Sequence, residues 1–171
     1  GPIAVVTQSG AFGVAVLDYM AGEEIGLSKF VSFGNKIDVN ETEMLHYLMH
    51  DDRTRVILLY AESIDAGRAF MEVAKEVTKY KPIVAIKAGR TEAGARAALS
   101  HTGAIAGSDK IYDSVFLQSG VLRARDMEEF LDMAEAFALQ PPAAGNNVAV
   151  VTSAGGPGIM AVDESVAQGV N

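Results

Sequence analysis

One of the three histidines in this sequence, His101, lies within a run of small residues, SHTGAIAG (100–107). A neutral imidazole nitrogen in such a run can attack a phosphoryl or acyl group, transfer a proton or bind a metal ion. It can also be an ordinary loop residue. The residue types alone leave these roles open, so the surrounding sequence must decide among them.

Charged side chains accompany this histidine in the sequence. Glu62 follows the apolar run 56–60, and Lys87, Arg90 and Arg96 flank the histidine run. If Glu62 lies beside His101, its carboxylate can accept a proton from the second ring nitrogen, which fixes the tautomer and raises the nucleophilicity of the first. The three cations can neutralise a phosphate, or they can be solvated loop charges.

A glycine turn near the start of the chain is a candidate anion site. The residues Gln8, Ser9 and Gly10 separate a β-branched run (3–7) from a helical pattern. Backbone N–H groups at a helix start point outward, and the helix dipole adds partial positive charge, so such a turn can bind phosphate. The sequence lacks the GK[ST] of a Walker A loop and the full G-x-G-x-x-G of dinucleotide domains.

The same unit occurs a second time near the end of the chain. VAVVTSAGGPGIMAVD (148–163) aligns without gaps with IAVVTQSGAFGVAVLD (3–18). This internal repeat of a strand, a glycine turn and a helix places Gly155 and Gly156 where a second anion site is expected. Two related helix starts can face one phosphate.

A metal site is not predicted. His46 and His50 are four residues apart on an expected surface helix, which is a possible chelating pair, but the sequence offers no evident third ligand. The polar loop 35–40 receives no role from the sequence.

Apolar periodicity and turn residues predict the elements that position these groups. Strands are expected at 3–7, 30–33, 56–60, 83–87 and 121–123. Helices are expected at 9–21, 40–50, 66–79, 108–118 and 126–138, with a loop at 88–107. Alternation of this kind predicts an α/β fold, a doubly wound, flavodoxin-like parallel five-stranded sheet. Ligands bind such sheets at the carboxyl ends of the strands, where the first glycine turn, Glu62 and the His101 run all fall.

The domain organisation follows from the same pattern. We expect a flavodoxin-type domain at 1–140, a linker at 141–147 with two prolines, and the truncated first strand and helix of a second similar domain at 148–171. Both ends are expected to continue into a longer protein.

Composition narrows the function classes. The net charge of −8 argues against a nucleic-acid partner, and no apolar run is long enough to predict a membrane span. With no cysteine and no secretory signal pattern, a cytoplasmic protein is expected.

The ordered motifs VVTQSGAFG (5–13), FGNKIDVN (33–40), YAES (60–63), KAGRTEAGARAALSHTGAIAGSD (87–109) and VTSAGGPG (151–158) resemble those of the nucleoside-diphosphate-forming acyl-CoA synthetases. Within that family the ADP-forming acetate–CoA ligases, relatives of succinyl-CoA synthetase, are the most similar. The resemblance covers essentially the whole chain, and SHTGAIAG followed by AGGPG is its most specific part.

The resemblance implies an acid–thiol ligase in which acyl-CoA and phosphate give an acyl phosphate, and the phosphoryl group passes through a histidine to ADP. It implies that His101 is the phosphorylated histidine and that Glu62 orients it. It also implies that Gln8, Ser9 and Gly10 together with Gly155 and Gly156 bind the phosphate. CoA and magnesium-bound ADP or ATP are implied ligands of the complete enzyme, and no cofactor is expected on this segment alone.

The implied partners are CoA-binding and ATP-grasp domains, or a subunit that carries them, in an oligomeric enzyme; the segment alone is not expected to be active. An acyl-CoA-sensing regulatory domain of a protein acetyltransferase is the alternative, although a sensor has no need of a nucleophile at position 101. A plain nucleotide or flavin binder is a third possibility, without a distinctive aromatic clamp to support it. The acyl substrate, the choice of ADP or GDP, and a one-chain or two-subunit organisation are not set by these residues.

Overall fold

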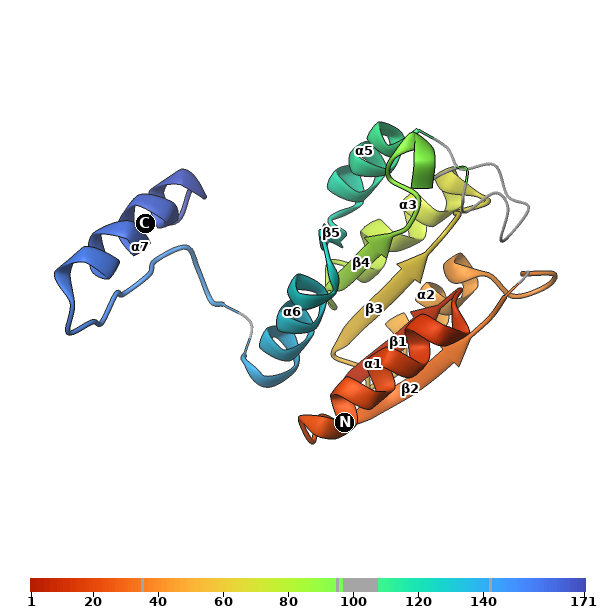
Figure 1. Ribbon diagram of the computed structural model, residues 1–171, viewed down its shortest axis with the longest axis horizontal. Coiled ribbons are helices and arrows are strands. Elements are labelled where there is room, and N and C mark those ends of the chain that lie inside the picture. Colours follow the sequence, from red (N-terminus) through yellow and green to blue (C-terminus); the bar gives the residue numbers. More distant parts are fainter. Residues whose placement is uncertain (35, 95, 97–107, 142) are drawn as a thin grey trace. The chain divides into compact units, whose positions relative to one another are not determined.

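A parallel β-sheet forms the centre of the structure. The computed structural model describes residues 1–34, 36–94, 96, 108–141 and 143–171, and the chain divides into two compact units, Gly1–Gln140 and Pro141–Asn171. The first unit holds five strands in the order β2-β1-β3-β4-β5, and every neighbouring pair is parallel. The strands are β1 (Ile3–Thr7), β2 (Leu27–Ser32), β3 (Val56–Ala61), β4 (Ile83–Lys87) and β5 (Leu122–Arg123). The predicted flavodoxin-like sheet is therefore confirmed (Figure 1).

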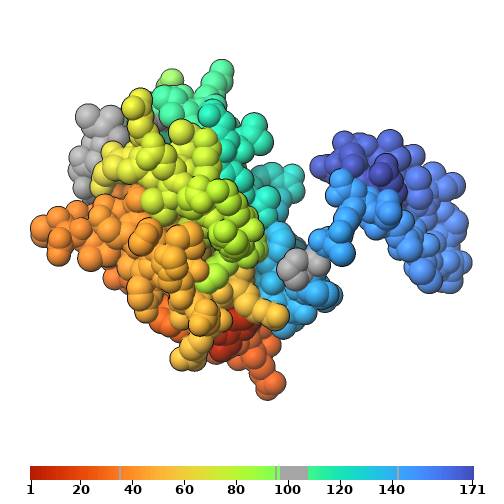
Figure 2. Space-filling view, turned by 180° about the vertical axis from the view of Figure 1, so that it is seen from behind, coloured from red at the N-terminus to blue at the C-terminus, as the bar shows by residue number. Residues whose placement is uncertain are grey.

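Helices cover both faces of this sheet, as the crossover connections of parallel strands require. They are α1 (Gly10–Gly22), α2 (Glu41–Met49), α3 (Gly67–Val77), α5 (Asp109–Ser119) and α6 (Met127–Leu139). The helices α1 and α6 pack on one face, and α2, α3 and α5 pack on the other. Figure 2 shows that second side, where side chains of α2, α3 and α5 hide most of the sheet.

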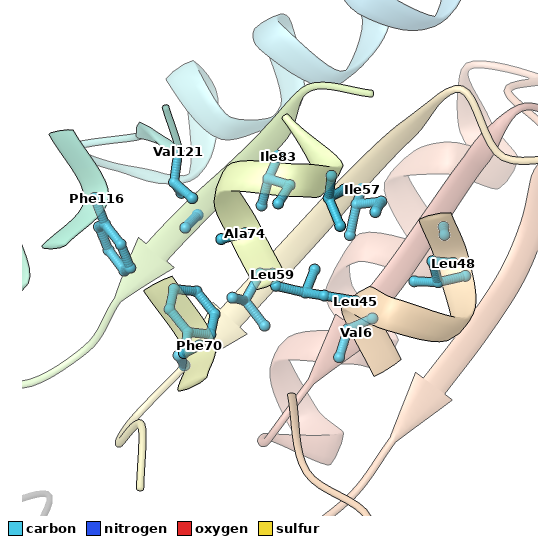
Figure 3. Packing of buried hydrophobic residues seen from close by; sticks show 14 of the residues in the cluster. Val6, Leu45, Leu48, Ile57, Leu59, Phe70, Ala74, Ile83, Phe116 and Val121 are labelled. Carbon is cyan, nitrogen blue, oxygen red and sulfur yellow. The ribbon is translucent and has the colours of Figure 1, made fainter. Parts of the chain in front are cut away.

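Each face of the sheet carries its own buried apolar cluster, because successive strand residues point to opposite faces. On the face of α2, α3 and α5, Leu59 of β3 is fully buried with Leu45 of α2 and Phe70 of α3 (Figure 3). On the other face, Leu58 lies with Val16 of α1 and Phe130 of α6. Burying one such side chain stabilises the fold by roughly 1.5–3 kcal/mol.

A glycine sets the distance between α1 and the sheet. A Cβ atom on Gly13 would lie 2.7 Å from Cζ of Phe30 and 3.0 Å from Cγ2 of Thr7. A side chain there would require the Phe30 ring to move or α1 to shift away from β1. Gly13 thus keeps the first turn of α1 close to the carboxyl end of β1.

Most expected boundaries differ from the structure by one or two residues, and two differences are larger. β2 begins at Leu27, three residues before the prediction. It pairs with β1 from Leu27 to Ser32, with a register shift after the first pair, although its side chains are mostly half-exposed and show no apolar run. Within the expected loop 88–107, residues 92–94 and 96 are helical. The hydroxyl of Thr91 accepts a hydrogen bond from Gly94 N at 3.0 Å, which is the bond of a helix N-cap and a signal already present in the sequence.

The second unit is built around one helix, α7 (Gly155–Ala167). Residues 148–152, expected as a strand, do not form one. A strand needs a hydrogen-bonded neighbour, and no other strand lies in the described part of this unit, 141 and 143–171. Instead, Val148 N donates to Asn171 O and Asn171 N donates to Asn146 O. Among the described residues of the whole chain, no helix is both long and apolar enough to cross a membrane.

Replacing Leu45 by Ala should destabilise the first unit by about 2–5 kcal/mol, because Leu45 is fully buried between α2 and the sheet. Leu117→Ala on α5 makes the same chemical change at a side chain that is 84% exposed, and should change stability by about 0.5 kcal/mol or less. Urea unfolding of both variants measures the difference. Equal losses would show that α2 does not depend on this packing.

Candidate active site

The central strands end side by side. Thr7 at the end of β1 is paired with Tyr60 of β3, and Ala61 at the end of β3 is paired with Lys87 of β4. The residues that leave these strands, among them Gln8 and Glu62, therefore start from one edge of the sheet. His101 lies outside the described residues, so its position at this edge stays a prediction.

Gln8 connects the ends of β1 and β3 through its side-chain amide. Its Oε1 accepts hydrogen bonds from Glu62 N at 2.7 Å and Ser63 N at 3.1 Å. Its Nε2 donates to Ser63 O at 2.8 Å and to Oε2 of Glu41 at 3.2 Å. The backbone N–H of Gln8 also donates to Tyr60 O. The structure thus brings Gln8 and Glu62 together as the sequence predicted, with Gln8 holding the turn that carries Glu62.

Ser9 and Gly10 form the start of α1. Ser9 is the N-cap, and its Oγ accepts a hydrogen bond from Phe12 N at 3.3 Å. The backbone N–H of Ser9 is bonded to Oγ1 of Thr7. Gly10 is exposed and is the first residue of the helix, where N–H groups have no acceptor within the helix itself. Gly10 is therefore better placed than Ser9 to offer a backbone N–H to an anion.

A buried ion pair lies next to this turn. Nζ of Lys36 is 3.2 Å from Oε2 of Glu41, and the two side chains are only 8% and 1% exposed. Lys36 also donates to the carbonyl and hydroxyl oxygens of Ser63, and lies 3.0 Å from Oδ2 of Asp65. Buried charges need such partners, because an uncompensated charge in the interior costs several kcal/mol. The pair ties the start of α2 to the turn after β3.

The electrostatics of the edge depend on Glu62 and Lys87. Burial raises the pKa of the Tyr60 hydroxyl, and the negative charge of Glu62 beside it raises that pKa further. Lys87 is 2% exposed, lies 4.5 Å from the centre of the Tyr112 ring and donates to the carbonyl of Ala88. Burial lowers the pKa of Lys87, and the charges of Asp109 and Glu62 partly offset this effect.

Ion pairs join the two ends of the segment that contains His101. Asp109, at the start of α5, pairs with Arg123 and lies 3.8 Å from Nε of Arg90. Arg90 also donates to the carbonyl of Arg125. Of the three cations that flank the histidine run, Lys87 is buried, whereas Arg90 and Arg96 are 45% and 73% exposed.

Gly155 and Gly156 begin α7 in the second unit. The turn before them repeats the one before α1. Oγ1 of Thr152 accepts from Ala154 N and donates to Ala154 O, as Oγ1 of Thr7 does with Ser9. The aligned repeat therefore forms the same local turn twice.

The histidine pair on α2 lies elsewhere. His46 and His50 have ring centres 5.4 Å apart and line a cleft of about 490 Å³ with Glu43, Tyr47 and Asp51. Within the described ranges, no group of three or more potential ligands is arranged to hold a metal ion.

Several residues of the edge were missed by the sequence. Glu41 was predicted only as a helix start, and Lys36 lies in a loop that received no role; Asn35, in the same loop, is outside the described residues. Ser63 was not singled out either. The same holds for Tyr112, whose phenolic oxygen accepts a hydrogen bond from Ile64 N. The one available signal was the motif FGNKIDVN (33–40), which contains Lys36 but does not indicate its partner.

The sheet order defines a flavodoxin-like α/β domain. The start of α1 is its candidate anion site, at the carboxyl edge of the sheet. The chain belongs to the succinyl-CoA ligase-like flavodoxin domain family, whose model matches residues 1–137. The resemblance drawn from the sequence motifs is thereby confirmed.

Relatives of known function are similar over nearly the whole chain. The chain is 50% identical to subunit alpha of the ADP-forming acetate–CoA ligase I of Pyrococcus furiosus, over all of this chain and 37% of the relative. It is 43% identical to the ADP-forming 4-hydroxybutyrate–CoA ligase of Nitrosopumilus maritimus, over 95% of this chain and 24% of the relative. The chain thus spans little more than a third of the first relative.

A solved structure has the same fold. It is that of the dinucleotide-forming acetyl-coenzyme A synthetase 1 of Candidatus Korarchaeum cryptofilum in complex with phosphate and ADP. The TM-score is 0.91 at 45% sequence identity, over 99% of this chain and 37% of that chain.

Lys87 should give the stability a defined pH dependence. Because burial lowers its pKa in the folded state below the ordinary 10.5, the folded protein loses this proton first as the pH rises. Between the pKa of Lys87 in the folded state and its higher pKa in the unfolded state, the unfolded state binds more protons. The free energy of unfolding therefore increases with pH over this range. Lys87→Met removes this contribution, and the parent should gain stability relative to the variant as the pH rises towards 10.5.

Urea unfolding between pH 7 and pH 10.5 measures the difference in free energy of unfolding between the parent and Lys87→Met. Lys110→Met, at an exposed lysine of α5, is the matched control and should show no such trend. A parent–variant difference that stays constant with pH would contradict the burial effect at Lys87.

Proposed function

We propose that the chain is the phosphohistidine-bearing part of an ADP-forming acyl-CoA synthetase. The observation that carries this proposal is the position of Glu62, held by Gln8 beside the start of α1, in a chain that is 50% identical to an acetate–CoA ligase subunit. The carboxylate and the helix start are the two features that a phosphorylated histidine at this edge requires. His101 is the proposed nucleophile.

The proposed reaction has three steps. A phosphate oxygen attacks the thioester carbonyl of acyl-CoA, the C–S bond breaks, and CoA leaves as the thiol after gaining a proton. A ring nitrogen of His101 then attacks phosphorus, and the P–O bond to the acyl group breaks to release the carboxylate. Finally, an oxygen of ADP attacks the phosphohistidine, the P–N bond breaks, and ATP leaves.

The chain's own residues take three roles in this scheme. The carboxylate of Glu62 accepts a hydrogen bond from the N–H of the second ring nitrogen of His101, so that the attacking nitrogen is unprotonated. Gly10 at the start of α1 offers backbone N–H groups to the phosphate, and Gly155 and Gly156 at the start of α7 are proposed to do the same. The positive end of each helix dipole stabilises the charge that the phosphoryl group carries.

The remaining sites belong, in this proposal, to other parts of the enzyme. CoA and magnesium-bound ADP or ATP would occupy CoA-binding and ATP-grasp domains or a subunit that carries them. The segment would then be inactive alone and would act in a cytoplasmic, oligomeric enzyme. The relatives include an acetate–CoA ligase and a 4-hydroxybutyrate–CoA ligase, so the acyl group is proposed only as a short carboxylic acid.

Phosphorylation of His101 tests the proposal directly. The full-length protein with any partner subunit, incubated with acetyl-CoA or 4-hydroxybutyryl-CoA and radiolabelled phosphate, should form an acid-labile, base-stable phosphoprotein. His101→Asn should abolish the label while thermal unfolding stays unchanged. Label that survives in this variant would refute the nucleophile, and an unlabelled parent that still binds acyl-CoA would favour the sensing domain.

Glu62→Gln should lower the rate of histidine phosphorylation by about 100-fold or more, because a neutral amide lacks the negative charge that stabilises the positive charge on the imidazole as it attacks. The folding midpoint should change far less, since the backbone N–H of Glu62 keeps its bond to Gln8. Rapid-quench phosphorylation and thermal unfolding measure the two effects. A parent-like rate in Glu62→Gln would remove Glu62 from the mechanism.

A further inference from the structure

The hydrogen-bonding capacity of the Gln8 side chain is fully used within the protein. An amide oxygen accepts two hydrogen bonds and an amide nitrogen donates two. In Gln8 both acceptor positions are taken by the N–H groups of Glu62 and Ser63, and both donor positions by Ser63 O and Glu41. A phosphate could reach this amide only if one of the four bonds broke.

These partners allow only one orientation of the amide. Two N–H donors lie on one side of it, so that side must be the oxygen. A carbonyl and a carboxylate lie on the other side, so that side must be the NH2 group. In a flipped amide, the NH2 group would face two N–H donors and the oxygen would face two acceptors. These partly buried polar groups would then be left without hydrogen bonds, which is destabilising.

Glu41 is held in its acceptor role by Lys36. Oε2 of Glu41 receives both Nε2 of Gln8 and Nζ of Lys36, each at 3.2 Å. Lys36 also donates to Ser63 O at 3.0 Å, so the turn after β3 is bonded to both side chains. The three side chains come from the end of β1, the loop before α2 and the first turn of α2.

We infer that Gln8 is a positioning residue, which together with Glu41 and Lys36 forms a clamp that fixes the turn carrying Glu62, and that its side chain does not bind the phosphate. This inference rests on the proposed function for the chemistry that Glu62 performs. It assigns phosphate binding at this turn to the backbone at the start of α1. It also gives a role to Glu41 and Lys36, whose side chains meet Gln8 and Ser63 in the structure.

The decisive variant is Gln8→Glu in the full-length protein with any partner subunit. It keeps the size and the acceptor that faces Glu62 N and Ser63 N, but it places a carboxylate oxygen against Glu41 and Ser63 O. Displacement of Glu62 should lower the rate of histidine phosphorylation at saturating substrates by about 10- to 100-fold. Because the new carboxylate can itself repel phosphate, the KM for phosphate is compared in the neutral variant Gln8→Met, where it should change by less than about threefold.

The double variant Gln8→Glu with Glu41→Gln supplies the rescue. The amide of residue 41 can donate to the new carboxylate. The double variant should therefore phosphorylate the histidine at least about fivefold faster than Gln8→Glu alone. A phosphate-binding role of Gln8 predicts no recovery, because the amide is still absent from position 8. Gln118→Glu, the same change at an exposed residue of α5, should leave the rate unchanged.

Hydrogen exchange gives a readout that does not depend on catalysis. In Gln8→Met the amides of Glu62 and Ser63 should lose protection, while those of Ile57 and Leu58 in β3 should keep it. Unchanged protection, a raised KM for phosphate at an unchanged maximal rate, or a double variant no faster than the single one would overturn the inference. A parent that forms no phosphohistidine, with the exchange result as expected, would instead refute the proposed function.

Discussion

The side chain of Gln8 holds together three elements that leave the sheet at one edge. Parallel strands end with backbone N–H groups that have no further neighbour in the ladder, and partly buried N–H groups need acceptors. At the end of β3 those groups belong to Glu62 and Ser63, and one amide oxygen serves both. Because Gln8 also directly precedes the capped start of α1, the helix start and the turn with Glu62 cannot move independently. The geometry of any phosphate site at this edge depends on that one connection.

The two helix starts of the repeat show how a local motif tolerates change. In the first copy Ser9 caps α1 by accepting from Phe12 N. In the second copy Ala154 stands at the N-cap position and has no side-chain acceptor, but the residue aligned with Phe12 is Pro157, which has no N–H to satisfy. A missing donor thus matches a missing acceptor, and proline is favourable in the first turn of a helix. Both turns keep the threonine that bonds the backbone at the N-cap position.

Charges of both signs lie at this edge of the sheet. The chain carries a net charge of −8, yet two buried lysines, Lys36 and Lys87, lie at the carboxyl ends of the strands. Lys36 is neutralised by Glu41, whereas Lys87 pairs with a carbonyl and an aromatic ring and so keeps a less compensated charge. Charges in such a low-dielectric region act more strongly than exposed ones. Local charge and helix dipoles at this edge, and not the net charge, therefore decide whether it attracts an anion.

Local patterns were sufficient for much of this structure. β-branched and apolar runs set β1, β3 and β4, Gly120 ends α5 and Asp126 caps α6. The repeat indicated both glycine turns. Each of these features depends on residues close in sequence. The placement of Glu62 directly after β3 followed from the same local patterns, whereas the position of His101 is still a prediction.

The hydrogen-bond partners of Gln8 could not be predicted from the sequence, because its bonds to Glu62 and Ser63 span 54 and 55 positions and require β1 and β3 to be neighbours. Nor could those of Glu41 and Lys36, which look like ordinary surface charges until the loop before α2 folds over the turn after β3. The sequence by itself determined which groups the edge of the sheet offers, and the tertiary structure decided which of them are already bonded to one another, because hydrogen bonds between distant segments form only where packing brings the segments together.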